Sequence, residues 1–214
     1  TPDLQPVALR LWCCKPGEKW VSDITYLKTN SGWLYLTVIL DLWDRTVIGW
    51  AFLEDREADH VCDALMMACT NHKPKSDLLF HSDRGVQYCS KEFRDALSAW
   101  CPQVGRSMSR KGNCWDNTCA ESFFKTLKVE VDKVEGTRTK EEVRVEVFEY
   151  IELYCNKRRR HSTLGYAIPI ALTHYSTGSG AGIKGRTHGF LPITGFFVWK
   201  INGVALCIRV GNFY

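Results

Sequence analysis

The sequence predicts an α/β protein in which helices pack on a mixed five-stranded sheet. Two observations carry this prediction. Three apolar, strand-like segments joined by short turns follow one another within residues 19–53, and from residue 58 onward helical and strand-like segments alternate. Three strands joined by tight connections form an antiparallel meander, and a strand–helix alternation after a meander favours a mixed sheet with helices packed on it.

The meander comes first along the chain. Its segments are rich in Trp, Val, Ile, Thr and Tyr, as is typical of strands. Strands are expected over residues 19–27, 33–42 and 46–53, with turns at Asn30-Ser31-Gly32 and Asp44-Arg45.

The alternating part follows. Proline residues are expected to stop two of its helices, and the capping box Thr139-x-x-Glu142 is expected to start another. In chain order, the expected elements are a helix over 58–71, a strand over 77–81, a helix over 91–100, a strand over 104–108, and helices over 118–131 and 139–159.

The tail has a different composition. Residues 176–189 are rich in Gly, Ser and Thr, as in a linker. Asn202-Gly203 then lies between two apolar runs, which is a strong signal for a β-hairpin. The predicted organisation is therefore an N-terminal arm over 1–18, a core with its C-terminal helix over 19–170, and a linker with a hairpin tail over 171–214.

Composition narrows the class of protein. The formal charge of +4 is compatible with a nucleic-acid partner without being diagnostic of one. The ten cysteines include no Cys-x-x-Cys pair, which disfavours a structural zinc site and favours reduced thiols in the cytoplasm. No apolar run reaches the length of about 20 residues that a membrane span requires, so no membrane partner is expected.

Asp23 is the first candidate metal ligand. It lies in the middle of a predicted strand, among aromatic and β-branched residues. A carboxylate in such a place is costly to bury unless it is paired or bound to a metal ion. The alternative is an exposed position on an edge strand, and the pattern alone leaves both interpretations open.

Asp83 is the second candidate. It follows a short apolar strand, in the segment His81-Ser82-Asp83-Arg84-Gly85. Ligands in mixed sheets gather at the carboxyl ends of strands. The alternative is an Asp turn followed by glycine, and the pattern favours neither interpretation.

Glu121 is the third candidate. Thr118-x-x-Glu121 fits a capping box, so one interpretation is a simple helix start. However, Glu121, Lys125 and Lys128 fall at i, i+4 and i+7 on one helix face, as suits a helix that holds a metal ion and lies along DNA. Mg²⁺ prefers oxygen ligands, and three carboxylates can bridge two such ions for phosphodiester chemistry.

Several long motifs, in order, resemble one family. The most specific is His81-Ser82-Asp83-Arg84-Gly85-Val86-Gln87-Tyr88. The others cover residues 20–26, 32–36, 41–45, 48–51, 107–117, 120–128 and 158–166. Over roughly residues 18–170 the chain resembles the second-frame product of insertion sequences, a transposase with a core of the retroviral-integrase type.

The resemblance implies a ribonuclease-H-like fold with a DDE triad on Asp23, Asp83 and Glu121, and Mg²⁺ or Mn²⁺ as the cofactor. It implies DNA cleavage at the element's ends, followed by strand transfer through a freed 3′-hydroxyl without a covalent protein intermediate. The implied partners are element-end and target DNA, further copies of the chain, and a helix-turn-helix protein from the first frame.

Basic residues near the triad are the expected DNA contacts. The alternative is a solvated charged surface, which is the usual meaning of a charge run. The expected contacts are Arg110, Lys111, Lys125, Lys128, Arg158, Arg159 and Arg160.

Two departures from the family pattern keep an alternative open. Between Asp83 and Glu121 lie 37 residues, a surplus of two over the family pattern, and the chain from Ser176 onward has no counterpart in it. The alternative to an active transposase is therefore an inactive DNA-binding remnant of one. A third interpretation, a nuclease acting on RNA–DNA hybrids, is disfavoured by the basic run at 158–160.

Overall fold

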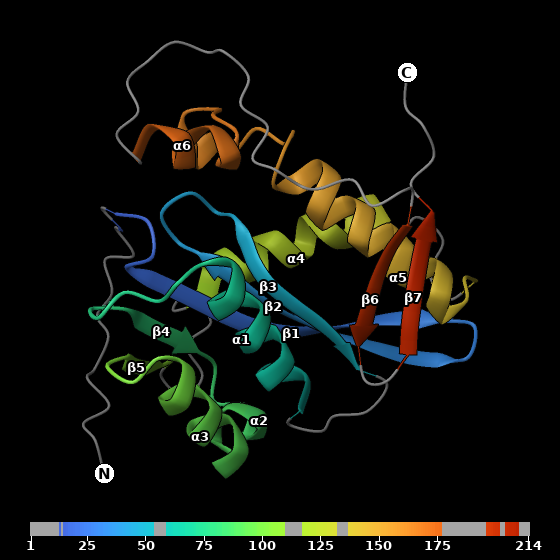
Figure 1. The fold of residues 1–214 in the computed structure, drawn as a ribbon. Helices are drawn as coiled ribbons and strands as arrows, with labels where there is room; N and C mark the ends of the chain where they lie inside the picture. The colour runs from blue at the N-terminus through green and yellow to red at the C-terminus, as the bar shows by residue number, and fades with distance from the viewer. Residues whose placement is uncertain are drawn as a thin grey trace. The chain divides into compact units, whose positions relative to one another are not determined.

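The structure is a computed structural model of the 214-residue chain (Figure 1). It describes residues 13, 15–53, 59–109, 117–131, 137–176, 196–201 and 204–209. The chain forms two compact units, Thr1–Ser179 and Gly180–Tyr214. The predicted three-part organisation, with boundaries after residues 18 and 170, stays a prediction.

The predicted mixed five-stranded sheet is confirmed. Its antiparallel meander consists of β1 (Lys19–Thr29), β2 (Gly32–Asp41) and β3 (Val47–Leu53). Two parallel strands, β4 (Leu79–Ser82) and β5 (Gly105–Met108), extend it beside β1. The strand order is β3-β2-β1-β4-β5, so β3 and β5 form the two edges.

β4 lies later in the chain than the sequence predicts. The backbone N–H of Leu78 donates to the carbonyl of Lys75, which closes a turn ahead of the strand. The strand therefore begins at Leu79 and extends through Ser82, directly before Asp83.

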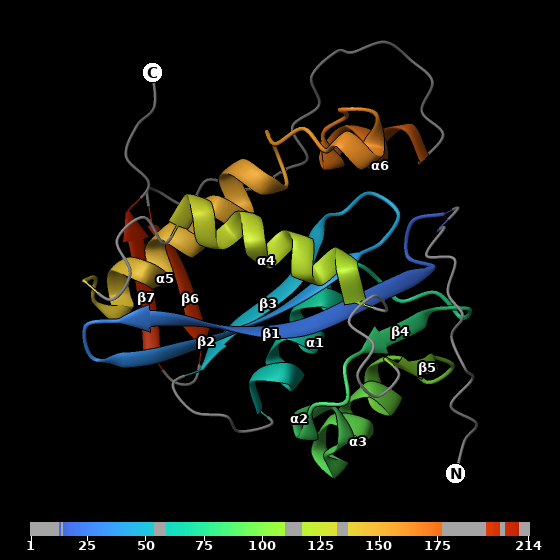
Figure 2. The same cartoon turned by 180° about the vertical axis from the view of Figure 1, so that it is seen from behind.

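Helices cover both faces of the sheet (Figures 1 and 2). One face packs against α1 (Asp59–Asn71), the short α2 (Val86–Cys89) and α3 (Lys91–Trp100). The other packs against α4 (Thr118–Val131) and α5 (Lys140–Phe148). Successive residues of a strand point to opposite faces, and accordingly Trp20 belongs to the α1 side and Val21 to the α4 side.

Gly49 of β3 allows α1 to approach the sheet closely. A Cβ atom at this position would lie 2.2 Å from the carbonyl oxygen of Ala64 and 2.8 Å from the Cβ of Ala68. Because the nearest atom belongs to the backbone of α1, rotation of a side chain could not make room for this Cβ atom. The glycine therefore fixes the spacing between β3 and α1.

The predicted long α-helix over 139–159 is wrong beyond Phe148. The helix starts with the predicted capping box, in which Thr139 and Glu142 each bond the other's backbone N–H. It then continues as the π-helix η2 (Glu149–Cys155), and the N–H of Asn156 donates to the carbonyl of Ile151, five residues back. The wider turn buries Tyr150, Ile151 and Cys155 together.

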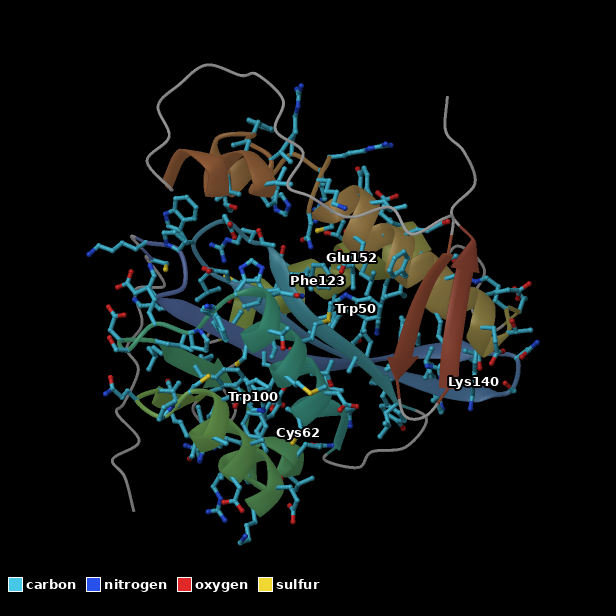
Figure 3. The ribbon with its side chains drawn as sticks, in the orientation of Figure 1. Trp50, Cys62, Trp100, Phe123, Lys140 and Glu152 are labelled. Atoms are coloured by element: carbon cyan, nitrogen blue, oxygen red, sulfur yellow. The ribbon has the colours of Figure 1, made fainter. Side chains whose placement is uncertain are left out.

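Two polar contacts join this helix to the edge strand β3. The indole Nε1 of Trp50 donates to Glu152 Oε1 at 2.9 Å (Figure 3). Asn156, which follows η2, uses its whole side-chain amide on Val47: its Oδ1 accepts from the Val47 N–H and its Nδ2 donates to the Val47 carbonyl, both at 2.9 Å.

The end of the chain adds short elements. A 3₁₀ turn, η3 (Ser162–Leu164), and a short helix, α6 (Pro169–Ser176), follow the basic run. In the second unit, β6 (Phe196–Ile201) and β7 (Val204–Arg209) pair antiparallel. This confirms the hairpin predicted around Asn202-Gly203.

The described cysteines fit the prediction of reduced thiols. All seven whose side chains the structure describes are free, including Cys69 and Cys101, whose sulfur atoms lie 3.4 Å apart in the core. Among the described residues there is also no helix whose length and apolar character would let it cross a membrane.

Candidate active site

Asp23 and Asp83 lie side by side on neighbouring strands. β1 and β4 run parallel, and Ser22 is paired with Ser82. The next residue of each segment is an aspartate, so the two carboxylates start from the same level of strands about 4.8 Å apart. The sheet register therefore brings together two residues that are 60 positions apart in the sequence.

Glu121 approaches the same place from α4. It lies in the first turn of that helix, whose buried residues Ala120, Phe123 and Phe124 pack on the sheet face to which Val21 belongs. Asp23 points to this face, because it lies two residues after Val21 on the strand.

The three carboxylates interact electrostatically. The pKa of Asp23 is raised to about 7, first because burial disfavours the charged form, and further by the negative charges of Asp83 and Glu121. The N–H of Ile24, which donates to Asp23 Oδ1 at 2.8 Å, acts in the opposite direction. Asp83 and Glu121 thus both lie within electrostatic reach of Asp23.

Each aspartate keeps one oxygen free of the described residues. Asp83 Oδ1 accepts from the N–H of Gly85 at 2.8 Å, as Asp23 Oδ1 accepts from Ile24. Neither Oδ2 atom has a hydrogen-bond partner in the described part of the chain. Nor does any described lysine or arginine form a salt bridge with Asp23, Asp83 or Glu121. Negatively charged oxygens are thus left over, which is the donor type that Mg²⁺ binds.

These carboxylates do not yet form a closed metal site. Within the ranges that the structure describes, no three Cys, His, Asp or Glu side chains are grouped so that they could hold a metal ion as they stand. The donor chemistry of the three carboxylates fits a divalent cation.

A buried hydroxyl pair behind the site was not predicted from the sequence. The hydroxyls of Ser22 and Tyr88 lie 2.7 Å apart with both residues fully buried, and Ser22 Oγ also donates to the carbonyl of Val38 at 3.0 Å. Burial raises the pKa of Tyr88 well above its ordinary value. The pair ties α2, which follows Asp83, to the strand that carries Asp23.

His81 has a structural role. It is buried, and its ring nitrogens lie 3.0 Å from the hydroxyl of Ser107 and 3.2 Å from that of Ser109. These contacts join β4 to β5 just before Asp83. Arg84 adds a bond from its Nε to the carbonyl of Ser109 at 2.8 Å.

The predicted DNA contacts have different surroundings. Arg110 and Lys111 lie outside the described residues. Lys125 is exposed on α4, whereas Lys128 is half-buried, with its Nζ 4.8 Å from the centre of the Tyr26 ring.

The three arginines of the basic run also differ in how exposed their side chains are. Arg158 and Arg160 are exposed, but Arg159 is half-buried and donates to the hydroxyls of Tyr150 at 3.4 Å and Thr126 at 3.1 Å. Because Thr126 is part of α4, Arg159 connects the basic run to the helix that carries Glu121.

Sequence comparison identifies related proteins. Residues 14–114 and residues 103–169 each match a model described as an integrase core domain, and together the two matches cover well over half of the chain. The chain is 47% identical to the transposase InsF for insertion sequence IS3A of Escherichia coli K12, over 72% of this chain and 53% of that protein. It is 39% identical to the transposase for insertion sequence element IS904 of Lactococcus lactis, over 76% and 63% respectively. The chain therefore spans only about half to two thirds of the length of these relatives.

Solved structures share the fold. A chain of the simian T-cell lymphotropic virus intasome in complex with PP2A regulatory subunit B56 gamma matches with a TM-score of 0.59 and 17% identity, over 92% of this chain and 67% of that one. The HTLV-2 integrase catalytic core domain in complex with magnesium matches with a TM-score of 0.56 and 13% identity, over 74% and 97%. These matches confirm the predicted ribonuclease-H-like fold.

Proposed function

Since the chain belongs to the integrase core domain family, we propose that it is the catalytic core of an insertion-sequence transposase, which cuts DNA at the ends of its element and joins those ends to target DNA. The observation that supports this proposal is that two further acidic residues act electrostatically on Asp23. Asp23 and Asp83 stand level on parallel strands, and the charges of Asp83 and Glu121 both act on Asp23.

Asp23, Asp83 and Glu121 are the residues that would hold Mg²⁺ or Mn²⁺. The chemistry that such ions supply when bound is charge stabilisation at the reacting phosphodiester oxygens. Since the pKa of Asp23 is about 7, its carboxyl must release a proton before all three groups are ionised.

The reaction consists of two in-line displacements at phosphorus. Water first attacks a phosphodiester bond at the element's end, a P–O bond forms to water, and the 3′-oxygen leaves and takes up a proton. The freed 3′-hydroxyl then attacks a phosphodiester of the target strand, whose own 3′-oxygen leaves. No bond to the protein forms in either step, so the role of the chain is to position the strands and stabilise charge.

The basic residues have different roles in binding DNA. Lys125, Arg158 and Arg160 are exposed and suited to phosphate contacts, and Lys128 lies on the same helix face as Lys125. Arg159 braces the basic run against α4. We assign Arg110 and Lys111 to phosphate contacts as well, on the basis of their place before Glu121 in the sequence.

Assembly is a further part of the proposal. One similar structure comes from an intasome and another is described as a trimeric form, which supports a homo-oligomer acting on paired DNA ends. A helix-turn-helix partner that recognises the element's ends completes the expected machinery.

The test replaces single triad residues by their amides. Asp83→Asn and Glu121→Gln are expected to lower Mg²⁺-dependent joining of a labelled duplex oligonucleotide to plasmid DNA by about 1,000-fold or more, because each removes a charged ligand. DNA affinity should change little. Glu130→Gln, at an exposed position of the same helix, and Asp95→Asn, on the surface of α3, are matched controls that should join DNA normally.

Three outcomes would contradict the proposal. Joining at the wild-type rate by either triad variant would refute the triad. A wild-type chain that binds DNA but shows no metal-dependent nicking would be the inactive remnant. A preference for an RNA–DNA hybrid over duplex DNA would identify a nuclease instead.

A further inference from the structure

Two aromatic rings stand exposed on the β1–β2 hairpin, away from the carboxylates. Tyr26 is 54% exposed and Trp33 is 43% exposed. Their ring centres lie 5.2 Å apart with the planes at 89°. In the strand register Tyr26 is paired with Tyr35 and Lys28 with Trp33, so Tyr26 and Trp33 are diagonal neighbours on one face of the sheet.

Positive charge surrounds this pair. Lys128 of α4 places its Nζ 4.8 Å from the centre of the Tyr26 ring, which is a cation–π contact. Lys28 is exposed and, two residues after Tyr26, lies on the same strand face. Exposed aromatic rings next to lysines suit a ligand that has both flat apolar surfaces and negative charge.

Lys128 links the pair to α4, the helix that carries Glu121, while the Tyr26 side chain points to the sheet face opposite Asp23, three positions away on β1. Glu121, Lys125 and Lys128 follow one another along one face of this helix, and the distance from Glu121 to Lys128 is about 10 Å from the helix rise. A DNA strand that follows these lysines away from Glu121 would therefore reach Lys128 and the Tyr26 ring beside it.

We propose that Tyr26 and Trp33 form a stacking site for unpaired DNA bases, a refinement that rests on the proposed transposase function. Unpaired bases are the chosen ligand because their faces are free to stack on an aromatic ring, whereas the bases of a duplex already stack on one another. Trp33 supplies the stacking face. Tyr26 supports it edge-on, and Lys128, held over Tyr26, binds the adjacent phosphate.

The experiment uses the full chain and a duplex oligonucleotide with a short single-stranded extension. The fluorescent base 2-aminopurine is placed at successive positions of the extension, and its quenching reports stacking. Wild-type protein is expected to quench most strongly at one position of the extension, the one whose base stacks on Trp33. Trp33→Ala should abolish this quenching and weaken binding of the extended duplex by about 5- to 100-fold, with little effect on a blunt duplex.

Two further variants make the result specific. Tyr26→Ala is expected to weaken binding less than Trp33→Ala, because it removes the support rather than the stacking face. Trp100→Ala is the matched control, since Trp100 is 47% exposed on α3 without belonging to this pair (Figure 3). Thermal unfolding of each variant establishes that the fold is intact, as expected for exposed side chains.

The contrary outcomes separate this inference from the proposed function. If Trp33→Ala quenches and binds like the wild type, the stacking site is refuted, even if Asp83→Asn still abolishes joining. If Trp33→Ala leaves DNA binding intact but lowers the oligomer mass in sedimentation, another copy of the chain covers the pair and the inference is also wrong. If the wild type neither joins DNA nor binds blunt duplex, the proposed function itself fails.

Discussion

Asp23 combines burial with two like-charged neighbours, and this combination governs its titration. Its pKa of about 7 lies above the ordinary 3.8 of an aspartate, mainly because of desolvation. Between about pH 4 and 7 the folded metal-free protein therefore holds a proton on Asp23 that the unfolded chain has already released. The free energy of unfolding thus falls as the pH rises from about 4 to 7 and does not change further above that range.

Asp23→Asn should make the metal-free protein more stable at pH 8 but not at pH 4. The amide cannot ionise, so the difference in unfolding free energy between variant and wild type should grow with pH from about 4 to 7, by at most about 1.4 kcal/mol per pH unit, and then level off. Urea unfolding in a chelating buffer at several pH values measures it.

Asp95→Asn, at an exposed position of α3, is the control. Its difference in unfolding free energy from the wild type should not grow with pH. A constant difference between Asp23→Asn and wild type across the pH range would mean that Asp23 is not perturbed.

At this scale the sequence motifs pointed to the three acidic residues, but they could not reveal the hydrogen bond between Ser22 and Tyr88 behind Asp23. Asp23, Asp83 and Glu121 each belong to a long motif that resembles one family. Ser22 and Tyr88, by contrast, form their hydrogen bond over 66 positions of sequence. A buried serine in an apolar strand signals that some partner exists, yet only the sheet register and the position of α2 determine which one.

On the scale of helices and strands, the contact between β3 and α1 leaves no room for an added side-chain atom at Gly49. Gly49 faces backbone and Cβ atoms of Ala64 and Ala68 at distances that no added Cβ could accept. Two small residues of α1 and one glycine of β3 therefore form a single packing unit.

Gly49→Ala is expected to destabilise the fold by about 1–3 kcal/mol, because the added methyl group must displace helix backbone. The unfolding midpoint in urea measures this change. Gly105→Ala is the matched control: its Cβ would meet the end of the Leu79 side chain at 3.2 Å, and that flexible end can move. Equal losses in the two variants would show that backbone proximity is not the cause.

The helices show where periodicity succeeds and where it fails. The bounds of α3 and α4 agree with the prediction, because apolar residues recur at helical spacing in both segments. The helix after Thr139 has a correct start, but its second half winds as a π-helix. The apolar spacing there resembles that of an α-helix, and the wider winding accompanies packing of Tyr150 and Cys155 against the core, which is a tertiary effect.

On the scale of the whole molecule, the chain divides into two compact units, and the boundary along the sequence lies between Ser179 and Gly180. The sequence predicted the fold class, the strand order in the chain and the hairpin, since these follow from local patterns. It could not fix where the first unit ends, because that depends on contacts of the segment around α6.

A chain shortened to Thr1–Ser179 is expected to unfold at the same urea midpoint as the full chain. Its free energy of unfolding should differ from that of the full chain by no more than about 0.5 kcal/mol. The reason is that the sheet and its covering helices lie entirely within the first unit, and an isolated two-stranded hairpin contributes little stability by itself. A clearly lower midpoint for the shortened chain would show that the second unit stabilises the first.

The amide of Asn156 has a consequence for the protein in concentrated solution. β3 is an outer strand, and outer strands expose backbone groups that can recruit strands of other molecules. At Val47 both of these groups are already satisfied by a side chain that imitates a neighbouring peptide. At Val47, Asn156 thus disfavours pairing of β3 with a strand of another molecule. The same side chain anchors η2 to β3.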